Sequence, residues 1–136
     1  MHNVAVYGTL KRGLSNSSLL SGQQFLGQGV TLDKFWMRDT GGFPVLFHGD
    51  VAPVRVEVYG VNDQVLAKLD QLEWNGRMFV RTYHEILVGA HNSRLKCFMY
   101  LGVEDFWKKR QSGLRDVTPV DEVLEWRPDY TRPRSA

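Results

Sequence analysis

The chain has 136 residues, of which 43% are hydrophobic, 12% aromatic and 24% charged, a composition that supports one folded domain and argues against general disorder. Because 17 Lys and Arg are scattered among 15 Asp and Glu, we expect no nucleic-acid partner. The single Cys97 has no disulfide partner and no apolar run reaches the ~18 residues of a membrane span, so we expect no membrane partner and a cytoplasmic location.

The N-terminal part of the chain predicts short strands. A β-rich run over residues 3–7 ends at Gly8, and the polar residues 9–18 that follow are typical of a loop. The sequence is then aromatic and β-branched from residue 24 through residue 36, which indicates a further stretch of strand.

Two more strands are predicted after a glycine break. Gly41-Gly42 interrupts the chain, which resumes over residues 43–47. Pro44 favours the edge of a sheet there, because proline cannot donate a ladder hydrogen bond. Over residues 54–59 apolar residues alternate with others, which is the period of a strand with one buried face.

One helix of about three turns is clearly predicted. Asn62 or Asp63 supplies its N-terminal cap and Gly76 its stop. Between these positions leucines recur at helical spacing, at Leu66, Leu69 and Leu72.

The C-terminal half predicts a hairpin and sets the fold class. Residues 79–88 and 95–101 have strand composition and are separated by a loop at residues 89–92. Many short strands with one marked helix predict an α+β fold, either a small β-barrel or a strongly curved mixed sheet with flanking helices. We expect one domain over residues 1–125 and a C-terminal arm over residues 126–136.

Glu73 is the first candidate functional residue. It follows Leu69 by four positions and Leu66 by seven, so its carboxylate belongs to the apolar stripe of the helix. A carboxyl group in an apolar setting has a raised pKa, which suits a general acid/base near neutral pH. The alternative is that Glu73 sits in a frayed last turn and points to water.

The second candidate is the segment Tyr7-Gly8-Thr9-Leu10 at the end of the first strand. Gly8 tolerates a positive φ, so the backbone N–H groups of Gly8, Thr9 and Leu10 can converge on an anion such as a carboxylate. An ordinary turn from strand to loop is the alternative at this position.

The remaining reactive side chains predict no second site. The histidines have no partner at i, i+4 and no cysteine companion, which argues against a metal site; they are His2, His48, His84 and His91. Serines in the first loop lack a nucleophile-elbow motif and favour loop or capping roles. Cys97 lies among alternating apolar residues, where a buried, inert thiol is expected.

Four motifs occur in order along the chain: VAVYGTLKRG at residues 4–13, VEVYGV at 56–61, LDQLE at 69–73 and FVR at 79–81. Together they span residues 4–101. This ordered set resembles the gamma-glutamylcyclotransferase-like family, and particularly its small gamma-glutamylamine cyclotransferase branch.

The resemblance implies a small β-barrel flanked by helices, with a pocket at one mouth and no cofactor. In this family the α-amine of a γ-glutamyl compound attacks its own γ-carbonyl and releases 5-oxoproline with a free amine or amino acid. Glu73 matches the catalytic glutamate. The resemblance assigns substrate contacts to the first loop and to a late strand: Tyr7, Gly8, Thr9, Leu10 and Tyr100.

One departure from the family pattern keeps a second hypothesis open. Phe79 stands where the family usually has Tyr, so any hydroxyl contact from that position is missing. That loss and the basic, aromatic C-terminal segment favour a non-catalytic ligand- or protein-binding module on the same fold. Retention of Glu73 favours the enzyme. Neither the leaving group nor the oligomeric state is predicted.

Overall fold

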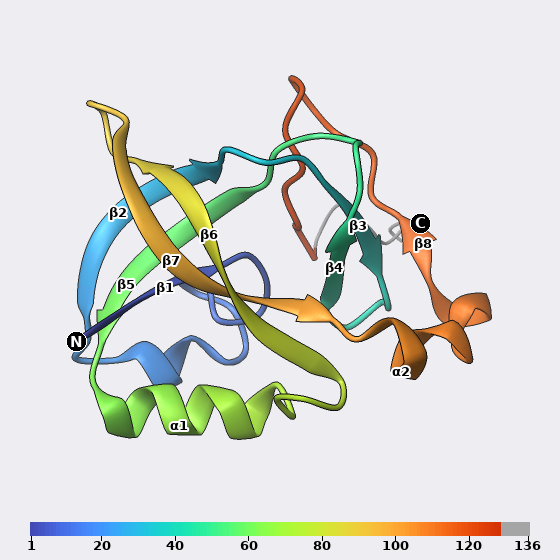
Figure 1. Cartoon of the computed structure of the whole chain (residues 1–136), viewed down its shortest axis with the longest axis horizontal. Coiled ribbons are helices and arrows are strands. Elements are labelled where there is room, and N and C mark those ends of the chain that lie inside the picture. The colour runs from blue at the N-terminus through green and yellow to red at the C-terminus, as the bar shows by residue number, and fades with distance from the viewer. Residues whose placement is uncertain (129–136) are drawn as a thin grey trace, which may run out of the picture.

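Five strands close into a barrel in the computed structural model, which describes residues 1–128 (Figure 1). Their order around the barrel is β1 (His2–Val6), β5 (Arg55–Val61), β2 (Gln24–Thr31), β6 (Phe79–Val88) and β7 (Ser93–Gly102). Neighbouring strands are antiparallel except for β1 and β7, which meet in parallel at Val4 and Phe98 and so close the barrel. Of the two predicted alternatives, the small β-barrel is confirmed.

A second sheet and two α-helices flank this barrel. The sheet has the order β4 (Pro44–His48), β3 (Phe35–Asp39) and β8 (Arg115–Asp116). In Figure 1, α1 (Asp63–Leu72) lies along one end of the barrel, and α2 (Glu104–Lys108) follows β7 beside the second sheet. Single 3-10 turns occur at Ser17–Leu20 and Gln111–Gly113. The edge position predicted from Pro44 is confirmed, because β4 borders its sheet.

The β-rich run from residue 24 to residue 36 contributes to two strands, because β2 and β3 belong to different sheets. The chain turns out of the barrel at Thr31, between β2 and β3. The Thr31 hydroxyl donates to the carbonyl of Asp33 at 2.7 Å and accepts the N–H of Val54 at 2.9 Å. These bonds satisfy the polar groups of a tight corner, so the chain leaves the barrel before Phe35 begins β3.

Helix α1 begins as predicted, with the Asn62 side chain accepting the N–H of Val65 at 2.8 Å. Its apolar face is buried: Leu69 has no exposed surface and packs in one cluster with Val4 and Val6 of β1. Leu72, the last leucine of the predicted stripe, remains 38% exposed. The helix is therefore fixed to the barrel along most of its length, while its last turn lies at an open edge.

The helix ends earlier than predicted, at a turn that does not use Gly76. Trp74 adopts a left-handed conformation with φ of 52°. Its N–H donates to the carbonyl of Gln71 at 3.2 Å, and the N–H of Asn75 donates to that of Asp70 at 2.9 Å. This is a Schellman turn with tryptophan in the place that glycine usually takes, at a cost of about 1–2 kcal/mol.

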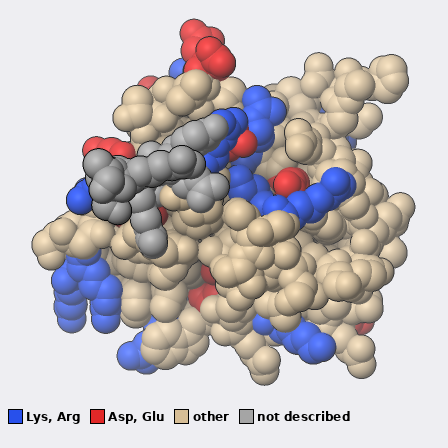
Figure 2. All heavy atoms as spheres, turned by 180° about the vertical axis from the view of Figure 1, so that it is seen from behind, with Lys and Arg blue, Asp and Glu red and all other residues tan. Residues whose placement is uncertain are grey.

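The first residue of the predicted C-terminal arm, Trp126, is buried. Trp126 is only 2% exposed, and its indole N–H donates to Oδ1 of Asp39 at 3.1 Å. Its carbonyl accepts a hydrogen bond from Nζ of Lys11 at 2.7 Å. Residues 129–136 of the predicted arm lie outside the described residues, so the division at residue 126 stays a prediction. On the face shown in Figure 2, Lys and Arg are interspersed with Asp and Glu.

Candidate active site

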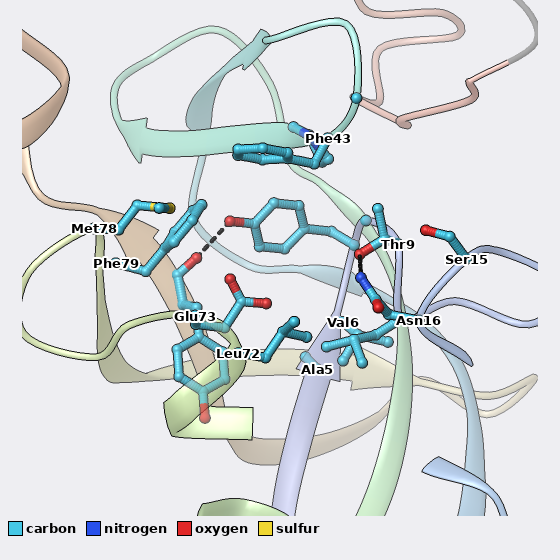
Figure 3. Close-up of a pocket in the computed structure, with 16 residues that line it drawn as sticks. Ala5, Val6, Thr9, Ser15, Asn16, Phe43, Leu72, Glu73, Met78 and Phe79 are labelled. Carbon is cyan, nitrogen blue, oxygen red and sulfur yellow. Dashed lines mark hydrogen bonds between the residues drawn. The ribbon is translucent and has the colours of Figure 1, made fainter. Parts of the chain in front are cut away.

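A cavity of about 290 Å³ opens where the end of β1, the loop after it, the end of α1 and the β3–β4 turn meet (Figure 3). That volume is at the lower limit of ordinary ligand pockets, which suits a small metabolite. Every residue that the sequence suggested for the site lines this cavity: Tyr7, Gly8, Thr9, Leu10, Glu73 and Tyr100.

The carboxyl group of Glu73 is half-buried and points into the cavity (Figure 3). Its backbone caps α1, with its N–H bonded to the carbonyl of Leu69 at 2.9 Å. No side chain or backbone N–H within residues 1–128 donates a hydrogen bond to its carboxylate. Burial without such a donor disfavours the charged form and raises the pKa of Glu73 to about 7. The alternative, a carboxylate in open water, does not describe this position.

Tyr7 ties the first strand to the last strand of the barrel beside Glu73. Its hydroxyl donates to the carbonyl oxygen of Tyr100 at 2.5 Å. Burial, and then the nearby charge of Glu73, raise the pKa of Tyr7 well above its ordinary value. The phenol therefore stays protonated at neutral pH and acts as a fixed wall of the cavity.

Tyr100 lines the cavity, but its hydroxyl is already engaged. That hydroxyl donates to Oδ1 of Asp70 at 2.6 Å, and the guanidinium Nε of Arg81 lies 3.4 Å from the same oxygen. Sequence reasoning assigned no role to Asp70 or Arg81, although both belong to quoted motifs, LDQLE and FVR. The sequence did contain a signal for this contact, because it places an acidic residue on the helix and a basic residue on the strand that follows.

Gly8 is required for a reason other than the predicted positive φ. Its φ is not left-handed; in this loop the left-handed glycine is Gly13, with φ of 78°. A Cβ at Gly8 would instead lie 2.9 Å from Cδ and Cγ of the Pro44 ring. Glycine therefore allows the loop and the β3–β4 hairpin to approach closely at the cavity.

The backbone of the loop nevertheless leaves donors free at the cavity. Within the described part of the chain, the N–H groups of Gly8, Thr9 and Leu10 have no hydrogen-bond acceptor. The loop is held by other bonds, including Asn16 Nδ2 to Thr9 Oγ1 at 2.9 Å. Three unpaired donors in succession suit an anionic group of a ligand.

The basic residues next in the sequence do not line the cavity. Lys11 turns to the carbonyl of Trp126, and the Arg12 guanidinium stacks over the Phe25 ring at 3.7 Å. Glu73 is therefore the one acidic or basic side chain among the described residues that line it.

Residues 1–128 give no support to a metal site, a reactive cysteine or a membrane-spanning helix. His, Cys, Asp and Glu form no group there that is arranged to hold a metal ion. Cys97 is fully buried, and burial raises the pKa of its thiol to about 11, which keeps it a thiol at neutral pH. None of the helices in this part of the chain has the length and apolar character to span a membrane.

We predict that Asp70→Ala destabilises the fold by about 1–3 kcal/mol, because it leaves the Tyr100 hydroxyl and the Arg81 guanidinium unpaired. Asp50→Ala is the matched control. The Asp50 side chain is 96% exposed, with Lys34 at 4.0 Å, and its loss should change stability by less than about 0.5 kcal/mol. Urea unfolding of both variants measures the difference. Equal effects would show that Asp70 does not fix the helix to β6 and β7.

The chain matches the family model described as gamma-glutamyl cyclotransferase, AIG2-like, over residues 4–121. It is 33% identical to a gamma-glutamylaminecyclotransferase of Rattus norvegicus, in a match that covers 74% of this chain and 77% of the rat protein. It is 44% identical over 72 residues to a Vibrio cholerae protein provisionally named a gamma-glutamylcyclotransferase. That match covers 53% of this chain and 62% of the Vibrio protein, so it spans less than two thirds of that relative.

A solved structure has the same fold. The crystal structure of an AIG2-like protein from Mus musculus is 30% identical to this chain and superposes with a TM-score of 0.70. The match covers 76% of this chain and 78% of the mouse chain. The fold of this chain is thus shared with that protein.

Proposed function

We propose, because the chain belongs to the AIG2-like gamma-glutamyl cyclotransferase family, that it is an enzyme converting a γ-glutamyl amine or related γ-glutamyl compound to 5-oxoproline and a free amine. The observation that carries the proposal is the half-buried carboxyl of Glu73, which is directed into the cavity and receives no hydrogen bond from residues 1–128. Similarity to the rat gamma-glutamylaminecyclotransferase favours the amine branch.

The proposed reaction needs one proton carrier. The substrate's α-nitrogen attacks its own γ-carbonyl carbon, the new carbon–nitrogen bond closes the lactam, and the bond to the leaving nitrogen breaks. The protons that the α-nitrogen loses are those that the leaving amine gains. A carboxyl with a pKa of about 7 is equally able to take and to give a proton at neutral pH, so Glu73 serves as general base and then as general acid.

Positioning supplies much of the remaining rate enhancement. Nucleophile and electrophile belong to one molecule, and holding the glutamyl chain in a bent, near-attack shape replaces a bimolecular encounter. The free N–H groups of Gly8, Thr9 and Leu10 suit the α-carboxylate, which fixes one end of that chain. Because the substrate carries both reacting groups, we expect no cofactor.

The competing hypothesis is a binding module that keeps the fold without the chemistry. A fully exposed Glu73, or a cavity filled by protein side chains, would favour it. The half-buried carboxyl and the open cavity of about 290 Å³ support the enzyme instead. Phe79 lines the cavity without a hydroxyl, as the sequence indicated, but the proposed proton transfers do not use that position.

We predict that the wild-type protein releases 5-oxoproline from members of a panel of γ-glutamyl amines and γ-glutamyl dipeptides. Glu73→Gln should lower kcat by about 10²–10⁴-fold, because glutamine cannot carry a proton. Glu104→Gln, at an exposed position outside the cavity, is the matched control and should keep the wild-type rate. Chromatographic assay of 5-oxoproline decides: a wild type without product on the whole panel, or an active Glu73→Gln, contradicts the proposal.

The same substitution should raise stability at alkaline pH. The pKa of Glu73 is about 7 when folded against an ordinary 4.5, so between these values the folded state binds more protons and its stability falls as pH rises. Glu73→Gln removes this loss. We expect about 1–2 kcal/mol more stability than wild type at pH 8, after discounting for solvent screening, and no difference below pH 4.5. Denaturant midpoints at both pH values test this; a destabilised variant at pH 8 would contradict it.

A further inference from the structure

The cavity has a polar end and an apolar end. In Figure 3 the polar side chains Thr9, Ser15 and Asn16 lie on one side of the view, and Met78 and Phe79 lie on the other. Glu73 lies between these two groups (Figure 3). A γ-glutamyl compound has the same order along its length: a charged α-carbon end, the γ-carbonyl and then the leaving group.

The apolar end is a rigid wall built around Trp107. The Trp107 ring packs edge-on against Phe43 and Phe79, with ring centroids 6.0 Å away in both cases. Its indole N–H donates to the carbonyl of Met78 at 3.0 Å. The turn that carries Phe43 is closed by a hydrogen bond from its N–H to Thr40 Oγ1 at 3.1 Å. This end is therefore preformed, and its side chains offer no strong hydrogen-bonding group.

The charge of the leaving group determines how well it fits this apolar end of the cavity. A leaving group with its own carboxylate would place a second negative charge near Glu73, without a cation among the described lining residues and against carbon surface. A leaving group with a distant ammonium would find only Glu73 as an acidic partner among the described lining residues. That ion pair would hold the carboxylate in its charged form and weaken it as a proton carrier. An uncharged apolar group meets neither difficulty and gains from burial.

We propose that the leaving group is an alkyl- or arylamine whose hydrocarbon part carries no charge, selected by Phe43, Met78 and Phe79 at the apolar end of the cavity. This inference rests on the proposed function and narrows it. In the reaction the γ-carbon–nitrogen bond to that amine breaks as the lactam bond forms. The α-nitrogen loses two protons as it changes from an ammonium to a lactam N–H, and the leaving nitrogen gains two as it changes from an amide N–H to an ammonium. Glu73 carries these protons between the two nitrogens, so no oxidant, reductant or other co-reactant is involved.

The test compares three γ-glutamyl compounds whose leaving groups share a four-carbon chain: n-butylamine, 4-aminobutyrate and putrescine. They differ only at the fourth carbon, which is a methyl, a carboxylate or a methylene that carries an ammonium group. We expect kcat/KM for the butylamine compound to exceed the other two by about tenfold or more. Equal or higher kcat/KM for either charged compound overturns the inference and leaves the proposed function intact.

Substitutions at the wall identify the selecting residue. Met78→Lys should raise kcat/KM for the 4-aminobutyrate compound relative to the butylamine compound by about tenfold or more, because it adds the missing cation. Met78→Leu keeps the apolar wall and should keep the wild-type preference. If Met78→Lys does not fold, Phe43→Lys tests the same charge at the same wall, because Phe43 also lines the cavity and is only partly buried.

The possible outcomes test the apolar leaving group separately from the cyclotransferase activity. Turnover of γ-glutamyl dipeptides but of none of the three amine compounds overturns the apolar leaving group alone. Absence of 5-oxoproline from every compound overturns the cyclotransferase as well. An unchanged preference in a folded Met78→Lys or Phe43→Lys contradicts selection at this wall.

Discussion

The carboxyl group of Glu73 is held half-buried in a cavity, without a hydrogen-bond donor from residues 1–128, and the rest of the site is arranged around that constraint. An unpaired carboxylate in such a place is costly, so its pKa rises to about 7. The cost lowers stability at neutral pH, while the raised pKa gives the group the proton affinity that cyclotransfer would use. Stability and proposed activity are therefore opposed at this residue.

Two structural features hold Glu73 at the cavity although burial of its carboxylate is unfavourable. Helix α1 ends at Leu72 and Glu73 is its C-terminal cap, because Trp74 turns left-handed, an unusual conformation for a large side chain. This turn fixes the position of Glu73 at the cavity. One turn earlier, Asp70 bonds the Tyr100 hydroxyl, and the Tyr100 carbonyl in turn accepts from Tyr7. The helix, β7 and the end of β1 are thus connected by hydrogen bonds beside the carboxylate.

The sequence predicted those parts of the structure that depend on local pattern. The cap at Asn62, the apolar stripe through Leu69 and the β6–β7 hairpin are set by residues close together in the chain, and all three occur. The placement of Glu73 beside the loop at Gly8 followed from the resemblance of ordered motifs, and the cavity brings both together. Periodicity alone left Glu73 undecided between cavity and solvent.

What the sequence did not predict depends on contacts between distant segments. Gly8 is needed because Pro44 approaches it, and the corner at Thr31 depends on Val54. The burial of Trp126 depends on a partner at Asp39, far earlier in the chain. No local pattern carries such information, since each contact exists only once the barrel has closed.

The most direct test of the central claim is to titrate the Glu73 carboxyl itself in the free protein. Carboxyl carbon chemical shifts followed by NMR from pH 3 to pH 9 give its pKa, and the resonance lost in Glu73→Gln assigns the signal. A midpoint near 7 is the predicted result. A midpoint near the ordinary 4.5 would show that water or another donor stabilises the carboxylate, and would contradict Glu73 as a proton carrier at neutral pH.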